Sequence, residues 1–172
     1  MKCLNVEIKA KCNNHKMIRS LLQSLNAEFN GIDHQIDTYF RTNNGRLKLR
    51  QGNIENHLIF YQRENKKGPK QSNIILFKSD PNSNLKEILL KSLGSKIVVD
   101  KLREIYFIDN VKFHLDKVKG LGTFIEIEAI DKNGHLGTKK LLAQCNKYLR
   151  LFRITDANLI SDSYSDLLLK ND

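Results

Sequence analysis

Two short segments near opposite ends of the chain alternate charged and apolar residues with the period of a β-strand. They are Val6–Lys11, which reads VEIKAK, and Phe124–Ala129, which reads FIEIEA. Because successive side chains of a strand point to opposite faces, the charged residues of each segment share one face. These residues are Glu7, Lys9 and Lys11 in the first segment, and Glu126 and Glu128 in the second. Aligned carboxylates suit a hard divalent cation and neighbouring bases suit a phosphate chain, so the segments indicate a site for a metal and an anion.

The composition of the chain favours an anionic partner. In 172 residues there are 29 Lys and Arg against 19 Asp and Glu, which gives a formal net charge of +10. Nucleic acid, membrane lipid and small polyphosphates all fit this charge. The length is usual for one domain, and a hydrophobic content of 40% is enough for a core.

The compartment is indicated by the N-terminal residues and the cysteines. Residues 1–5 run directly into charged residues and lack the apolar core of a signal peptide. No apolar run approaches the roughly 20 residues that span a bilayer. The cysteines, 3 in all, show no CxxC spacing, which argues against a disulfide framework and a zinc site. We expect a soluble, cytoplasmic protein without membrane contact.

Hydrophobic periodicity and turn residues predict both strands and helices, which places the chain in the α+β class. Strand patterns cover residues 4–12, 36–40, 46–50, 58–63, 73–78, 96–108, 111–118 and 124–130. Helical patterns cover the segment from the Asn13-Asn14 cap to Phe29, then residues 85–93, 138–151 and 164–169. Gly31 is expected to separate the first helix from the next strand. Most strands follow one another through hairpin-length connections, which predicts an antiparallel sheet.

One face of nearly every predicted strand carries charge, and this has two explanations. The first is a sheet whose outer face is solvated, the commonest cause of such alternation. The second is a closed barrel whose polar face lines an interior. The alternation by itself favours the solvated sheet.

The motifs along the chain, taken in order, resemble those of the CYTH family, also called triphosphate tunnel metalloenzymes. Residues 5–9 are similar to the family's N-terminal Glu-x-Glu-x-Lys motif, with Glu7 and Lys9 in matching positions and Asn5 at the first Glu. Further resemblance lies in Asp37–Phe40, Gly45–Arg50, Tyr61–Arg63, Gly68–Lys70, Lys101–Tyr106, His114–Asp116, Gly120–Glu128 and Ser163–Leu168. The set looks most like the class IV adenylyl cyclase branch and implies one domain over residues 1–172.

The resemblance implies an eight-stranded antiparallel closed β-barrel, a tunnel with helices packed outside. It implies that the triphosphate-binding residues are Lys9, Lys48, Arg50, Arg63 and Arg103, with Lys11 and Lys101 as further candidates. It implies that the residues holding Mg²⁺ or Mn²⁺ are Glu7, Asp116, Glu126 and Glu128. Lys9 and Lys11 are also candidates for the catalytic base, because crowding by cations and loss of water favour a neutral lysine.

Three functions are compatible with such a tunnel. The first is an adenylyl cyclase that converts ATP to cyclic AMP and pyrophosphate. The second is a triphosphatase that hydrolyses tripolyphosphate, a nucleoside triphosphate or thiamine triphosphate. The third is a non-catalytic protein that binds polyphosphate or a nucleotide. Nucleic acid is not expected as a partner, because it gives the paired acids no role, and the oligomeric state stays open between monomer and homodimer.

Two expectations concern individual residues. Asn5 offers a neutral oxygen where the family motif has a carboxylate, so metal binding should be weaker or differ in geometry. Asp37 could orient a tunnel arginine or cap a local turn. Cations gathered in one cavity repel one another, so removing an arginine such as Arg50 should lower triphosphate affinity and raise stability.

Overall fold

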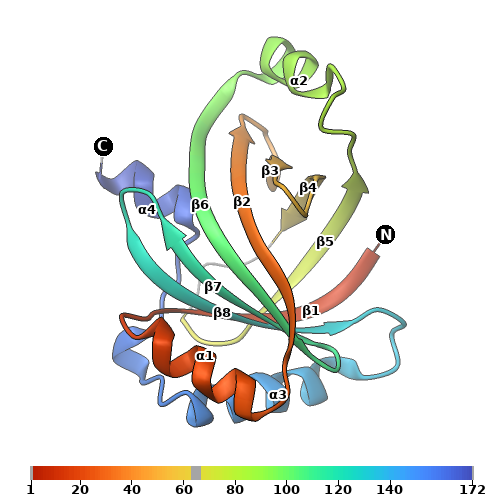
Figure 1. Ribbon diagram of the computed structural model, residues 1–172. Helices are drawn as coiled ribbons and strands as arrows, with labels where there is room; N and C mark the ends of the chain where they lie inside the picture. Colours follow the sequence, from red (N-terminus) through yellow and green to blue (C-terminus); the bar gives the residue numbers. More distant parts are fainter. Residues whose placement is uncertain (1, 63–66, 172) are drawn as a thin grey trace.

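The computed structural model describes residues 2–62 and 67–171, which contain eight β-strands and four α-helices (Figure 1). The strands are β1 Lys2–Lys11, β2 Glu28–Phe40, β3 Arg46–Gln51, β4 His57–Gln62, β5 Lys70–Lys78, β6 Ser95–Ile108, β7 Val111–Val118 and β8 Gly122–Asp131. The helices are α1 His15–Ser24, α2 Leu85–Leu93, α3 Gly137–Leu151 and α4 Tyr164–Asn171. The predicted α+β class and the antiparallel sheet of eight strands are confirmed. None of the described helices is long and apolar enough to cross a membrane.

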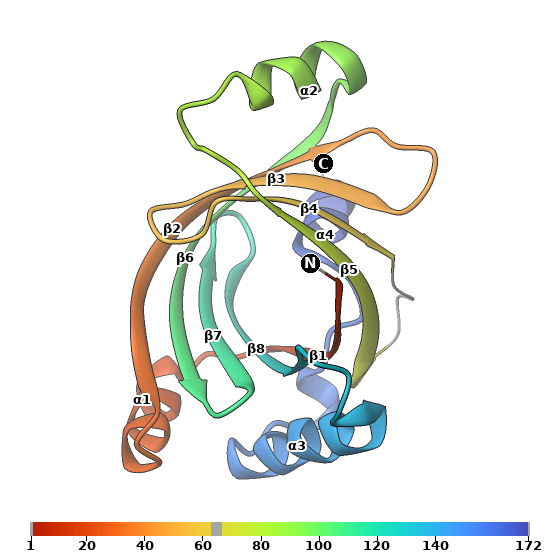
Figure 2. The ribbon, with the colours of Figure 1, turned by 90° about the vertical axis from the view of Figure 1, so that its right-hand side faces the viewer.

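The strands form one strongly curled, tunnel-like sheet, which Figure 2 shows from the side of the opening. The hydrogen-bonded order is β1-β5-β4-β3-β2-β6-β7-β8, and β1 pairs with both β5 and β8. In the β1–β8 pair, Glu7 lies opposite Glu128 and Lys9 lies opposite Glu126. The two alternating segments are therefore neighbours, and their charged residues lie directly across from one another.

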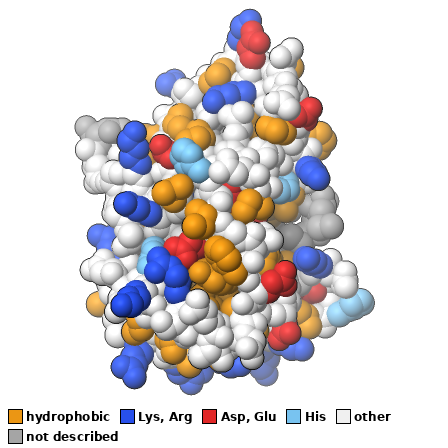
Figure 3. Space-filling view, viewed as in Figure 1, with side chains coloured by type: hydrophobic (Ala, Val, Ile, Leu, Met, Phe, Trp, Pro, Cys, Tyr) orange, Lys and Arg blue, Asp and Glu red, His pale blue; other side chains and the backbone are white. Residues whose placement is uncertain are grey.

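The charged faces of the strands point into the curled sheet and apolar faces point outward. Lys101 is 2% exposed and Arg103 3%, whereas Phe77 on β5 is 61% exposed and Ile32 on β2 is 57% exposed. Figure 3 shows hydrophobic side chains gathered on the face that β2 and β6 present in this view. The solvated-sheet interpretation is therefore wrong, because the alternating charges line an interior.

The largest hydrophobic core lies outside the tunnel, between the sheet and two helices. The outer faces of β1, β7 and β8 contribute Ile8, Phe113 and Ile127, and α1 and α3 contribute Leu22 and Cys145, all nearly or fully buried. Figures 1 and 2 both show α1 and α3 below these strands. Burying one large aliphatic or aromatic side chain stabilises a fold by about 1.5–3 kcal/mol. This core therefore stabilises the strands that carry the carboxylates, while their inner faces remain polar.

The first helix is shorter than the sequence pattern predicts. Asn14 caps α1 by accepting a hydrogen bond from the backbone N–H of Met17 at 3.0 Å. The helix ends at Ser24 instead of extending to Phe29, because Asn26 adopts a left-handed conformation with φ of 54°. Phe29 belongs to β2, which continues past Gly31 with a shift in its register to β6. Gly31 therefore does not separate two elements but lies at an irregularity within one long strand.

The C-terminal segment folds back against the sheet and brings one aromatic residue to the interior. The backbone N–H of Ile160 donates to the carbonyl of Lys9 at 2.9 Å, and Lys70 Nζ donates to the carbonyl of Ser161 at 2.6 Å. The segment then enters α4, whose first residue, Tyr164, is 5% exposed. This course places the Tyr164 hydroxyl among the charged residues of β6, β7 and β8.

Candidate functional site

A single cavity inside the sheet brings together most of the residues predicted from the sequence. The predicted residues that line it are Glu7, Lys9, Lys48, Arg50, Arg103, Glu126 and Glu128. They come from β1, β3, β6 and β8, strands that are far apart in the sequence. Because the sheet is curled, the charged faces of these separate strands form one continuous surface.

Two predicted residues are placed differently, and Arg63 lies outside the described residues. Lys11 is exposed at the end of β1, where the described part of the cavity lining does not reach. Asp116 is fully buried behind Arg103, and it contacts that arginine rather than the open cavity.

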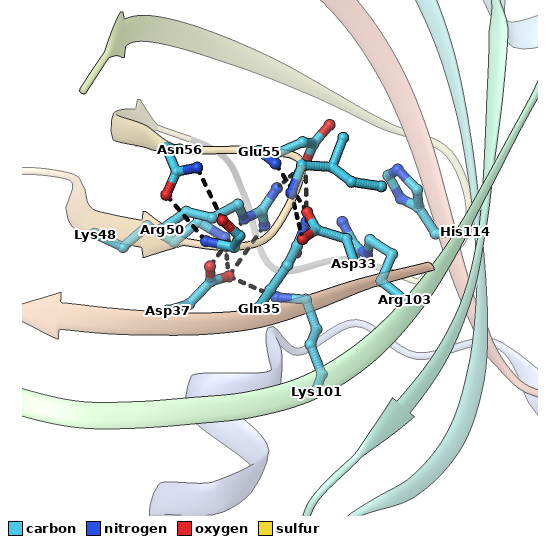
Figure 4. Close-up of polar contacts among 12 residues, drawn as sticks. Asp33, Gln35, Asp37, Lys48, Arg50, Glu55, Asn56, Lys101, Arg103 and His114 are labelled. Atoms are coloured by element: carbon cyan, nitrogen blue, oxygen red, sulfur yellow. Dashed lines mark hydrogen bonds and ion pairs between the residues drawn. The ribbon is translucent and has the colours of Figure 1, made fainter. Parts of the chain in front are cut away.

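Asp37 is the centre of a basic cluster on the β2 and β3 side of the cavity. Arg50 lies opposite Asp37 in the strand register and holds it with two N–H groups, Nε at 2.8 Å and Nη2 at 3.0 Å. Lys48 Nζ and Lys101 Nζ reach the same carboxylate at 2.9 Å and 2.7 Å. Figure 4 shows the three cations converging on Asp37. Of the two roles predicted for Asp37, orienting an arginine is the one the structure supports.

The charge of this cluster is positive. Burial opposes ionisation of Asp37, but Arg50, Lys101 and Lys48 outweigh it and hold the pKa of the carboxyl well below its usual range. One ionised carboxylate thus faces three basic side chains, of which Lys101, with its pKa lowered to about 7, is only partly charged at neutral pH. The excess positive charge faces the cavity and is available to an anion.

The opposite side of the cavity is acidic. Arg103 donates to Asp116 through Nε at 2.7 Å and through Nη2 at 2.6 Å, and Nη2 also reaches Glu126 at 2.6 Å. Lys9 Nζ lies 3.1 Å from the other oxygen of Glu126. The Tyr164 hydroxyl donates to Asp116 at 2.7 Å. Both carboxylate oxygens of Asp116 therefore accept hydrogen bonds from Arg103 or Tyr164, and Arg103 is held by two carboxylates.

The carboxylates that line the acidic side of the cavity are Glu7, Glu126 and Glu128, which follow one another along the β1–β8 pair. Within residues 2–62 and 67–171, no three His, Cys, Asp or Glu side chains lie close enough together to bind a metal ion by themselves. Mg²⁺ is commonly bound through one or two carboxylates together with substrate phosphates. The donor set fits a cation of that kind, shared with a bound phosphate chain, and does not fit a site built from protein ligands alone.

His114 also lines the cavity, between Lys112 and Asp116 on β7. Its Nδ1 lies 3.2 Å from Glu126, and a carboxylate can only accept, so Nδ1 carries the hydrogen. Burial and the nearby Arg103 lower the pKa of His114 to about 4, which keeps the ring neutral at physiological pH. Its Nε2 is buried and has no hydrogen-bond partner among the described atoms.

Sequence reasoning missed three charged residues of the cavity, Lys112, Glu55 and Lys132, and left a fourth, Lys101, open. Lys112 shares the inward face of β7 with His114, so the alternation of that strand could have identified it. Lys101 was a further candidate for binding the triphosphate. It is buried, and burial lowers its pKa to about 7. Glu55 lies in the loop between β3 and β4, where no periodic pattern indicates the direction of a side chain.

One wall of the cavity is apolar. It is formed by side chains of β4 and β5, namely Ile59, Ile74 and Leu76, beside the rings of Tyr39 and Tyr61. The cavity therefore presents a basic side, an acidic side and an apolar wall. An elongated anion with a flat, apolar group could contact all three.

Comparisons with known proteins identify the family and the fold. The family model described as CYTH domain matches residues 4–164. A protein of Methanocaldococcus jannaschii, MJ0240, which is named as a candidate adenylate cyclase, is 29% identical over 180 residues, 95% of this chain and 98% of that protein. The solved structure of the PH1012 protein from Pyrococcus horikoshii OT3 is similar with a TM-score of 0.76 and 25% identity, over 95% of this chain and 98% of that one.

A more distant solved structure shows the same fold in a plant protein. This is HpAC1 from Hippeastrum, named as a candidate adenylyl cyclase and described as having a dominant triphosphatase activity. Its TM-score is 0.67 with 13% identity, over 99% of this chain and 96% of that chain. At this identity the likeness concerns the fold alone.

Proposed function

Because the chain belongs to the CYTH domain family, we propose that it binds a linear triphosphate in its cavity and converts ATP to cyclic AMP and pyrophosphate with a divalent cation. The observation that carries this proposal is the division of the cavity into a basic side around Asp37, an acidic row along β1 and β8, and an apolar wall. A nucleoside triphosphate has a polyanionic chain, a metal-binding phosphate surface and an apolar base, which correspond to these three parts.

The phosphate chain is held by side chains that reach it from several strands. These are Lys9, Lys48, Arg50 and Arg103, with Lys101 beside them and Arg63 as a further predicted ligand. Arginine suits this role because its planar group forms two parallel hydrogen bonds to phosphate oxygens. Asp116 acts through Arg103, whose orientation it fixes with two hydrogen bonds.

Glu7, Glu126 and Glu128 would hold Mg²⁺ or Mn²⁺ together with phosphate oxygens. When bound, such a cation draws negative charge off the phosphates and so makes the reacting phosphorus more electrophilic. Asn5 keeps its neutral amide at the end of this row. The number of carboxylates therefore favours one shared cation.

The cyclase reaction joins the ribose 3′-oxygen to the α-phosphorus and breaks the bond from that phosphorus to the bridging oxygen. Pyrophosphate leaves with the electron pair of that bond, and the hydroxyl proton passes to a base. Of the two lysines predicted as this base, Lys9 lines the cavity and is assigned the role, whereas Lys11 is exposed. The ring of Tyr164 packs against Lys9, whose Nζ lies 3.9 Å from the ring centre.

A triphosphatase is the second candidate, and the apolar wall is the observation that favours it. Ile59, Ile74 and Leu76 have no side-chain hydrogen-bonding groups, so this wall does not select one base over another. A site that binds chiefly the phosphate chain accepts tripolyphosphate as readily as ATP. Water would then attack the terminal phosphorus and release orthophosphate.

A product assay separates these functions. The protein is incubated with ATP and, separately, with tripolyphosphate, each in Mg²⁺ and in Mn²⁺, and the products are identified by chromatography. Cyclic AMP with pyrophosphate supports the cyclase, and orthophosphate supports the triphosphatase. Lys48→Met should reduce turnover, and Lys91→Met on the exposed surface of α2 removes the same charge as a matched control. Binding without turnover would leave a non-catalytic triphosphate-binding protein, and no binding of either compound would refute the proposal.

A further inference from the structure

The loop between β3 and β4 is firmly attached to β2 by a buried carboxylate. Asp33 is fully buried and accepts hydrogen bonds from the backbone N–H groups of Ile54 at 2.9 Å and of Glu55 at 3.0 Å. Gln35 donates to the same carboxylate at 2.7 Å. The backbone that carries Glu55 is therefore fixed relative to the cavity.

The same loop is closed by contacts between its own ends. Asn56 accepts a hydrogen bond from the backbone N–H of Gly52 at 3.1 Å and donates to its carbonyl at 2.9 Å. Gly52 lies so close to Asp33 that an added Cβ would be 2.6 Å from a carboxylate oxygen. A loop with these constraints does not behave as a lid, because no part of it can move without breaking several contacts.

The side chain of Glu55 points into the cavity from this fixed loop. One carboxylate oxygen accepts from Arg50 Nη1 at 2.9 Å and from Gln35 Nε2 at 3.0 Å, and the other accepts from Lys112 Nζ. Burial opposes its ionisation, but Arg50 and Lys112 hold the pKa of Glu55 well below its usual range. Glu55 is therefore a permanent negative charge in the cavity wall.

Arg50 is shared between two carboxylates that lie on different sides of its guanidinium group (Figure 4). Asp37 holds Nε and Nη2, and Glu55 holds Nη1. Phosphate oxygens can approach the cluster around Asp37, where cations are in excess. Beyond Arg50 a further phosphate group would meet the Glu55 carboxylate, which already satisfies Lys112 and repels an anion.

We propose that Glu55 is a specificity-determining residue, a fixed anionic stop that ends the phosphate site at Arg50. This inference rests on the proposed function, since it assumes that the phosphate chain lies along the basic side of the same cavity. The tunnel then binds a chain of three phosphates better than a longer chain. Without such a stop, an ordinary cationic site binds a longer polyphosphate more tightly, because the longer chain carries more charge.

The test is a calorimetric titration of the protein with tripolyphosphate and with linear tetrapolyphosphate, in the absence of divalent cations so that nothing is hydrolysed. The wild-type protein should bind tripolyphosphate more tightly than tetrapolyphosphate. Glu55→Gln should raise the affinity for tetrapolyphosphate by about tenfold or more and change that for tripolyphosphate by less than about threefold. Glu87→Gln, which removes one negative charge from the exposed surface of α2, should leave the ratio unchanged.

Each other outcome overturns the inference in a recognisable way. If the wild-type protein binds tetrapolyphosphate more tightly than tripolyphosphate, Glu55 is not a stop. This result needs no variant, so it holds even if Glu55→Gln fails to fold. An unchanged ratio in a folded Glu55→Gln protein also contradicts it, and weaker binding of both ligands shows that Glu55 only orients Arg50. In these cases triphosphate binding, and with it the proposed function, still stands. If neither ligand binds, the proposed function itself fails.

Discussion

The side-chain amide of Asn5 donates a hydrogen bond to the carboxylate of Glu128, joining β1 to β8 at the acidic side of the cavity. Asn5 is fully buried, and its own oxygen has no hydrogen-bond partner among the described atoms. Glu128 also lies opposite Glu7 in the strand register. A neutral donor at this position therefore gives Glu128 a hydrogen bond from β1, where the residue directly opposite, Glu7, is also acidic.

Asn5→Asp should make the site more dependent on metal. The variant replaces a donor by a third carboxylate beside Glu7 and Glu128, so the metal-free protein should unfold at a lower temperature than the wild type. With tripolyphosphate present, the affinity for Mn²⁺ should rise by about tenfold, because the cation gains a charged ligand. Thermal unfolding with and without Mn²⁺, and a Mn²⁺ titration followed by electron paramagnetic resonance, measure the two effects. Asn44→Asp, an exposed change of the same charge, should show neither, and an unchanged Mn²⁺ affinity in Asn5→Asp would count against this metal position.

Arg50→Ala should weaken triphosphate binding and also destabilise the protein. Loss of charge-assisted hydrogen bonds corresponds to about 10- to 100-fold in affinity. Repulsion among the cations led us to expect higher stability from the sequence, but Arg50 is the partner of the buried carboxylate of Asp37 and the partly buried carboxylate of Glu55. Removing one partner of a buried ion pair costs on the order of 3 kcal/mol.

Isothermal calorimetry and urea unfolding measure these two changes in Arg50→Ala. Arg50→Lys is the matched control, since it keeps the charge and loses the paired N–H groups that hold Asp37. It should recover part of the stability and less of the affinity. Normal triphosphate binding by Arg50→Ala would remove Arg50 from the phosphate site.

Lys101 should make triphosphate binding dependent on pH. Burial lowers its pKa in the folded protein to about 7, below the ordinary lysine value of about 10.4. A bound polyanion favours the charged form, so binding above about pH 7 takes up a proton and affinity falls as the pH rises. Calorimetry in buffers of different ionisation enthalpy should detect this uptake at pH 8 in the wild type. Lys101→Met should lose it, and an equal uptake in both proteins would assign the proton to another group.

The same shift has a consequence for stability. Between about pH 7 and pH 10.4 the unfolded chain holds the Lys101 proton and the folded chain does not. The contribution of Lys101 to the free energy of unfolding therefore rises with pH across this range. The stability of the wild type should therefore rise relative to that of Lys101→Met between pH 7 and pH 10, which urea unfolding at several pH values would measure.

Tyr164→Phe should show how much the C-terminal segment, as distinct from the strands, contributes to stability and to triphosphate binding. The variant removes the hydroxyl that donates to Asp116, while Arg103 still holds this carboxylate. The expected cost is about 1 kcal/mol in the free energy of unfolding, with a small loss of triphosphate affinity through a less rigid Arg103. Tyr148→Phe on α3 is the control, because Tyr148 packs against Phe113 in the outer core. Equal effects of the two variants on affinity would show that the Tyr164 hydroxyl does not support the site.

Much of the sheet could be predicted from local patterns, whereas the direction of its charged faces could not. Alternation identifies Glu126 and Glu128 as neighbours on one face, and the β1–β8 register brings Lys9 to the same place. Period alone does not say whether a face is inside or outside, because exposed apolar side chains such as Phe77 give the same alternation. The family resemblance supplied the inward direction, and the burial of Lys101 and Arg103 agrees with it.

The parts of the site that escaped sequence reasoning depend on contacts distant in the chain. Asp33 and Glu55 are joined through the backbone of a loop, and nothing in the spacing of either residue indicates this. Asp116 matched a family position for a metal ligand, but its bonds to Arg103 and Tyr164 arise only when β7, β6 and α4 meet. Local sequence thus indicates which groups are present, and tertiary structure decides which of them pair.

The position of β1 between β5 and β8 also determines when the site can form during folding. Asn5 and Glu128 are 123 residues apart in the sequence, and β1 gains its second neighbour only when β8 arrives. Pairings of this kind are slow to form, because a long segment of chain must be closed before the contact compensates for the lost entropy. A polyanion added during refolding would therefore act late, by capturing molecules whose strands have already met, and would not accelerate the pairing of β1 with β8 itself.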